Sequence, residues 1–126
     1  MKKSFLLSAA LFMPSMAFAQ AVPADLLLES ARSLKAQTGP SYFASGDLSC
    51  YSHNMCGMIF RSCKISMDGK SVDLSMEDSF QLIKALAIEE PHWDMTAKFS
   101  VSAVHREVPP YDVRTHAEVS DIVMGN

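Results

Sequence analysis

The sequence predicts a single small α+β domain, in which an antiparallel sheet of about five strands carries two helices packed on one face. Three patterns lead to this prediction. Residues 95–104 alternate between apolar and polar side chains, as expected for a strand with one buried face. Asp68-Gly69 separates two strand-like runs, which is the strongest short signal for a hairpin. Residues 23–37 and 75–90 instead repeat apolar side chains at helical spacing, so the expected order is α-β-β-β-α-β-β.

Residues 1–19 have the pattern of a secretory signal peptide. Two lysines precede an apolar run at 5–13, and the small-x-small triplet Ala-Phe-Ala at 17–19 favours cleavage before Gln20. A membrane anchor is the alternative, but the apolar run is shorter than the roughly 20 residues that a spanning helix needs. We therefore expect a signal peptide at 1–19, a single domain at 20–126, and a location in the periplasm of a Gram-negative bacterium or outside the cell.

The charge of the expected mature chain argues against two classes of partner. Removing Lys2 and Lys3 with the signal peptide leaves nine of the 11 basic residues against 14 acidic ones. An acidic domain without a basic cluster binds nucleic acids and anionic membranes poorly. We expect no nucleic-acid partner and no stable membrane insertion after signal cleavage.

The first expected helix covers residues 23–37 and is followed by a strand. Pro23 suits the first helical turn, and Gly39-Pro40 ends the helix. Residues 41–51 then mix aromatic and aliphatic side chains with Gly46, which predicts a strand carrying a bend or a bulge.

The hairpin around Asp68-Gly69 has a register that the turn itself predicts. A two-residue type I′ turn needs positive φ at both central positions, which Asp-Gly accommodates, so the second strand is expected over 57–67. The expected cross-strand pairs are Met67 with Lys70, Ile65 with Val72, Lys64 with Asp73 and Cys63 with Leu74. This register turns the side chain of Cys63 toward the core.

The second helix and the last two strands complete the predicted sheet. Ser75 and Asp78 form a Ser-x-x-Asp capping pattern ahead of an apolar stripe, and Pro91 ends the helix. After the strand at 95–104, a pair of prolines interrupts the alternation, which resumes over 111–119. We expect these two strands to pair antiparallel.

The three cysteines are expected to form one disulfide in an oxidising compartment. Cys56 and Cys63 on one extended strand would lie about 23 Å apart, far beyond the roughly 7 Å limit for bridged α-carbons. Pairing Cys50 with Cys63 would require the first strand to be displaced from a simple hairpin register. The sequence interpretation is therefore a Cys50–Cys56 disulfide, with Cys63 as a free buried thiol.

A disulfide between Cys50 and Cys56 would enclose a short loop that suits protein recognition. Constraining a loop lowers the entropy lost on binding, and aromatic residues with polar neighbours supply area and directional bonds. The candidate binding residues of this loop are Tyr51, His53, Asn54 and Met55. A possible second anchor is formed by His92 and Trp93, and the alternative for Trp93 is packing in the core. The alternative is an ordinary hairpin end, which the disulfide only stabilises.

Soft sulfur and imidazole ligands cluster in two places, which raises copper(I) binding as an alternative function. The candidate ligands are His53, Met55, Met58, His92 and Met95. Over four residues, His92-Trp93-Asp94-Met95 is similar to the His/Trp/Met sites of periplasmic copper chaperones. A disulfide at Cys56 would remove the thiolate from the first cluster, so the leading prediction assigns no metal and no cofactor.

No pattern in the chain assigns catalytic residues. The motifs G-x-S-x-G, C-x-x-C and H-E-x-x-H are all absent from the sequence. We predict an exported periplasmic protein that is not an enzyme and that binds another protein, as an inhibitor, an immunity protein or an accessory of an envelope machine. The alternatives are a periplasmic copper-binding protein and a small secreted enzyme of unknown class.

Overall fold

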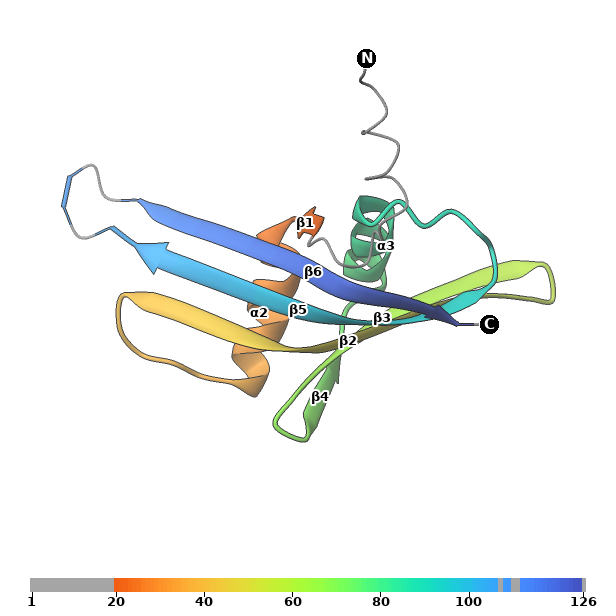
Figure 1. The fold of residues 1–126 in the computed structure, drawn as a ribbon, viewed down its shortest axis with the longest axis horizontal. Helices are drawn as coiled ribbons and strands as arrows, with labels where there is room; N and C mark the ends of the chain where they lie inside the picture. Colours follow the sequence, from red (N-terminus) through yellow and green to blue (C-terminus); the bar gives the residue numbers. More distant parts are fainter. Residues whose placement is uncertain (1–19, 107, 110–111, 126) are drawn as a thin grey trace, which may run out of the picture.

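The computed structural model, which describes residues 20–106, 108–109 and 112–125, confirms the α+β fold (Figure 1). The elements in order are β1 (Gln20–Val22), α2 (Ala24–Leu34), β2 (Ser41–Met55), β3 (Met58–Met67), β4 (Lys70–Asp73), α3 (Met76–Ala85), β5 (Trp93–His105) and β6 (Val113–Gly125). The predicted signal peptide, 1–19, lies outside the described residues. Within the described part of the chain, no helix is long and apolar enough to cross a membrane.

The sheet has six antiparallel strands in the order β1-β6-β5-β2-β3-β4. The sequence predicted about five strands. The additional strand is β1, which pairs Gln20 with Val119 and Val22 with Ala117. The predicted pairing of the last two strands is confirmed, and β6 extends to Gly125.

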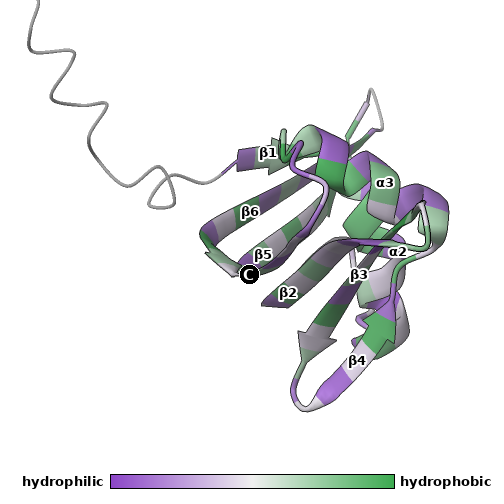
Figure 2. Cartoon of the chain, turned by 90° about the vertical axis from the view of Figure 1, so that its right-hand side faces the viewer, coloured by the Kyte–Doolittle hydropathy of each residue, from purple (hydrophilic) through white to green (hydrophobic). Residues whose placement is uncertain are grey.

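Both helices pack on one face of the sheet, as predicted (Figure 2). Strand residues alternate accordingly, and those that face the helices form the buried core. The opposite side, which we call the open face, carries many small hydroxyl side chains. They include Ser45, Ser49, Thr96, Ser100 and Ser102.

The turn and cap predicted between β3 and α3 are confirmed. Asp68 and Gly69 both have positive φ, 53° and 79°, and β3 pairs with β4 in the predicted register. Beyond β4, the Leu74 N–H donates a hydrogen bond of 2.9 Å to the Cys63 carbonyl. The Ser75 hydroxyl caps α3 by accepting from the Asp78 N–H at 3.1 Å.

Gly46 permits a close approach between strands, and β2 has no bulge there. Its pairing with β5 and β3 is continuous, so the bulge that was one of the two predicted features at Gly46 is absent. A Cβ at Gly46 would overlap the Ser66 carbonyl and crowd Met67 and Phe99. The irregularity of the sheet lies instead in β6, where Asp121 has a φ of 54° and the register with β5 shifts.

Candidate functional site

The β2–β3 hairpin ends in a two-residue turn that the sequence reading missed. Cys56 and Gly57 have φ values of 54° and 78°, and Met55 pairs directly with Met58. Positive φ at both central residues defines a type I′ turn. The segment expected to be a loop, 51–55, is therefore the last part of strand β2.

This turn corrects the predicted disulfide. Cys50 lies six residues before the turn and Cys63 six residues after it, so the two face each other and form the disulfide, with a Cα–Cα distance of 4.1 Å. The Cys50–Cys56 prediction is wrong, because six residues of extended strand separate these α-carbons by about 20 Å. The predicted free thiol at Cys63 is also wrong. Cys63 is buried as expected but bonded, and the free cysteine is the exposed Cys56.

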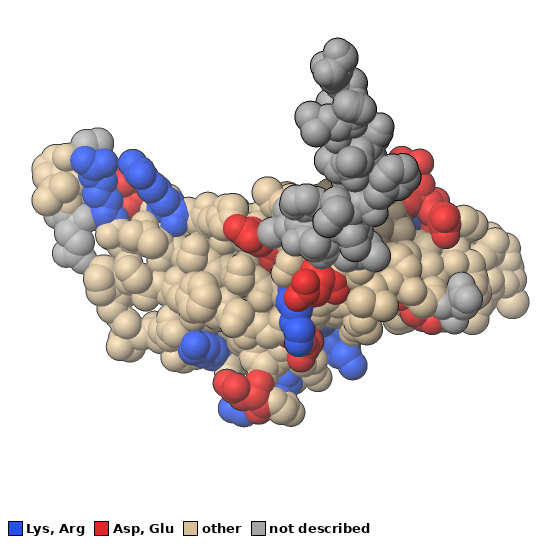
Figure 3. Space-filling view, viewed as in Figure 1, with Lys and Arg blue, Asp and Glu red and all other residues tan. Residues whose placement is uncertain are grey.

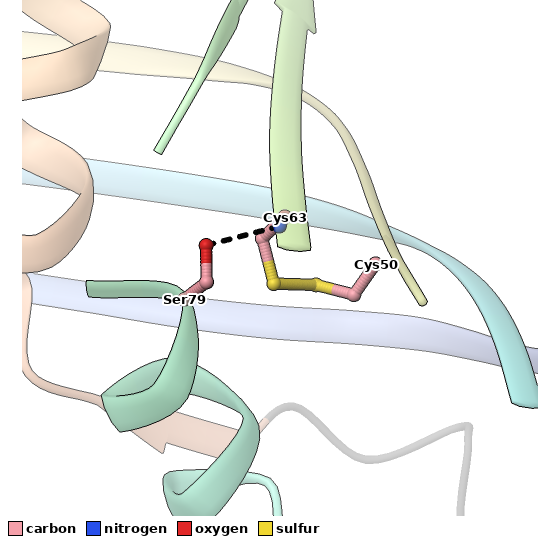
Figure 4. The surroundings of a disulfide bond; sticks show 3 residues. All are labelled: Cys50, Cys63 and Ser79. Atoms are coloured by element: carbon pink, nitrogen blue, oxygen red, sulfur yellow. Dashed lines mark hydrogen bonds between the residues drawn. A yellow bond between two sulfur atoms is a disulfide. The ribbon is translucent and has the colours of Figure 1, made fainter. Parts of the chain in front are cut away.

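The disulfide anchors the hairpin to the core and to helix α3. Cys50 and Cys63 are 3% and 1% exposed. The buried Ser79 hydroxyl of α3 accepts a 3.0 Å hydrogen bond from the Cys63 N–H (Figure 4). The base of the hairpin is therefore held by a covalent bond and by a helix, whereas the residues beyond the base extend away from the core.

Beyond the disulfide, large apolar side chains are exposed. We call Tyr51, His53, Met55 and Met58 the recognition tip, because their alternation and pairing place all four on the open face. Tyr51, Met55 and Met58 are 41%, 52% and 61% exposed. At the right of Figure 3, the extremity of this hairpin shows no charged side chain on the viewed face. Of the four predicted binding residues, only Asn54 points to the other face.

His53 organises the polar part of the recognition tip. Its Nε2 lies 3.0 Å from Asp94 Oδ1, and its ring stacks on His92 with centroids 4.5 Å apart. The Tyr51 ring lies 5.1 Å away on the other flank. The structure thus brings together His53 and His92, which the sequence assigned to separate clusters. With Tyr51, their rings form one aromatic and imidazole surface.

Trp93 belongs to the core, which was the alternative to a surface anchor that the sequence left open. Strand β5 begins at this residue, and alternation places its indole on the helix-covered face, where it is 2% exposed. Its partner across the strands, Ser52, is also buried and donates a 3.1 Å hydrogen bond to the Pro91 carbonyl. Only His92 of the proposed second anchor is at the surface.

The predicted copper ligands are not gathered at one point. Met95 is 1% exposed and lies on the helix-covered face, whereas His53, Met55 and Met58 lie on the open face. Among the described residues, no group of three or more His, Cys, Asp or Glu could hold a metal ion.

A shallow hollow of about 450 Å³ lies elsewhere on the open face. Its lining includes Asp47 and Lys98, whose carboxylate and ammonium groups are 2.7 Å apart. The hydrogen bond that Lys98 Nζ donates to this carboxylate raises the pKa of Lys98. Both side chains are more than half exposed, so the pair contributes little to stability.

Comparison with known proteins leaves the recognition tip as the main guide to function, since no family model, curated protein or solved structure matches the chain.

The sequence reading did not identify the exposed run Met58-Ile59-Phe60 as surface. The available signal was Gly57 directly before three consecutive apolar residues, because consecutive strand residues cannot all face one core.

Proposed function

We propose that this is an exported protein that acts by binding another protein through its recognition tip. The observation that carries the proposal is the exposure of Tyr51, Met55 and Met58 on a hairpin whose base is fixed by the buried Cys50–Cys63 disulfide. Exposed apolar groups that sit together are typical of interaction sites. An inhibitor, an immunity protein or an accessory of an envelope machine would all use such a surface.

The disulfide supports both parts of this proposal. Stable disulfides form in oxidising compartments, which agrees with the signal-peptide pattern at 1–19 and with a periplasmic location. A hairpin that is already ordered loses less conformational entropy on association than a flexible loop does. The stacked rings of His53 and His92 add polar contacts that can orient a partner.

The test is affinity capture from a Gram-negative envelope extract with residues 20–126 as bait. Tyr51→Ala and Met58→Ala remove exposed side chains from the recognition tip. Phe43→Ala is the matched control, because Phe43 is exposed on the open face near the other end of β2. We expect a captured protein to be lost with either tip variant and retained with the control. Equal capture by all variants would overturn the proposed site.

A further inference from the structure

Strand β3 has an unpaired edge between Met58 and Ser62. Strand β4 pairs only with residues 64–67, so this part of β3 is bonded to β2 alone. The Cys63 N–H and C=O point away from β2, because they bond to Ser79 and Leu74. In an antiparallel ladder alternate residues point the same way, so the N–H and C=O of Ile59 and Arg61 also face outward. No hydrogen bond within the described residues reaches them from that side.

A hollow adjoins this edge where a neighbouring strand would run. The chain leaves the position beside β3 at Leu74 and turns into helix α3. The resulting space has a volume of about 310 Å³ and is lined by Ile59, Phe60, Leu74, Met76 and Phe80, among others. Three of these side chains, Ile59, Phe60 and Phe80, are 46%, 41% and 42% exposed. Outward backbone groups beside an apolar hollow are the features that an added strand satisfies.

We propose that the occupant of this edge is β3 of a second copy of the chain, paired antiparallel about a two-fold axis at Ile59. Each Ile59 would then exchange N–H to C=O hydrogen bonds with Ile59 of the other copy. Met58 lies opposite Phe60 of the second copy, so apolar side chains meet apolar side chains. Arg61, the one charged residue of the segment, falls opposite Gly57 and not opposite a second arginine.

The position of Leu74 selects this register. Leu74 occupies the place opposite Cys63, so an added strand must end by Ser62. With the two-fold axis at Ile59, Cys56 of the second copy lies opposite Ser62. The turn of the second copy therefore ends before the position that Leu74 occupies. An axis at Phe60 would bring its Gly57 opposite Cys63, where Leu74 already lies. A two-fold contact uses the same patch on both subunits and closes at a dimer.

This pairing leaves three of the four recognition-tip residues outside the contact and includes only Met58, so it goes beyond the proposed function. The contact is made along the backbone edge, whereas Tyr51, His53 and Met55 belong to the neighbouring strand and point to the open face. A two-fold axis perpendicular to the sheet keeps the helices of both copies on one side of a continuous sheet. A dimer would therefore present two recognition tips on the same face.

Sedimentation velocity of residues 20–126, from micromolar to near-millimolar protein, tests the association. We expect a monomer–dimer equilibrium that Ile59→Lys weakens by about tenfold or more, because two lysines would face each other at the axis. Ser71→Lys is the control, since Ser71 is exposed on β4, at the outer edge of the sheet. A monomer at every concentration, or equal weakening by both variants, would overturn the proposal without bearing on partner capture.

Disulfide trapping tests the register. In a Cys56→Ser background, Ile59→Cys places two thiols opposite each other at the axis, with α-carbons about 5.5 Å apart, within bridging range. Under mild oxidation we expect Ile59→Cys to form covalent dimers about tenfold faster than Phe60→Cys or Ser71→Cys. Trapping that is fastest at Phe60 or Ser71, or absent at Ile59, would contradict the proposed axis.

Discussion

Breaking the Cys50–Cys63 disulfide is expected to lower the free energy of unfolding by about 3 kcal/mol. The bond joins residues 13 positions apart in the sequence. The chain-entropy model assigns about 3 kcal/mol to a closed loop of this size. For a domain of about 100 residues, that loss corresponds to a fall in Tm of roughly 15 °C. Both cysteines are buried, so replacing them also removes packed atoms from the core.

Urea unfolding followed by far-ultraviolet circular dichroism, with and without reductant, measures this effect. We expect reductant to destabilise the wild type and Cys56→Ser equally, because Cys56 is free and exposed at the turn. The double variant Cys50→Ala/Cys63→Ala should begin at the lower stability and not respond to reductant. The reasoning is refuted if Cys56→Ser abolishes the response, or if peptide mapping joins Cys50 to Cys56.

Three further predictions concern the scaffold that supports the hairpin. Gly46→Ala should lower the free energy of unfolding by about 2 kcal/mol, because its Cβ would overlap the Ser66 carbonyl; an unchanged urea midpoint would contradict this. Ser79→Ala should cost about 1–3 kcal/mol by leaving the buried Cys63 N–H without its acceptor, and Ser79→Thr should recover part of this loss in the same assay if the hydroxyl is responsible. Burial raises the pKa of Tyr42 above the 10.0 of the unfolded chain, so the contribution of Tyr42 to stability should be constant below about pH 10 and fall above it. Tyr42→Phe should reduce that fall in urea titrations at alkaline pH.

Local sequence patterns predicted those structural elements that are determined by a few neighbouring residues. Asp68-Gly69 predicted both a turn and the register of β3 with β4, because few residues other than Asn, Asp and Gly accept positive φ. Ser75 likewise predicted the start of α3. The short strand β1 could not be predicted in this way, because three residues do not establish a period and its pairing depends on the distant β6.

The errors at the candidate site come from one turn and one strand boundary. Cysteine is an unusual residue at a positive φ, so Cys56-Gly57 did not indicate a turn, and the register that brings Cys50 opposite Cys63 was lost. Trp93 could not be assigned between a surface anchor and the core, because the strand was expected to begin at Met95. Extending the alternation back by two residues would have placed Trp93 on the buried face.

The burial of Trp93 also gives the molecule a built-in optical probe. It is the only tryptophan in the chain, and it lies in the same buried cluster as the sulfur atoms of Cys50 and Cys63. Indole emission shifts to longer wavelength when water reaches the ring, so the native fluorescence spectrum reports the integrity of this region without any attached dye. Loosening of the hairpin base would therefore be measurable as a shift of the Trp93 emission maximum to longer wavelength.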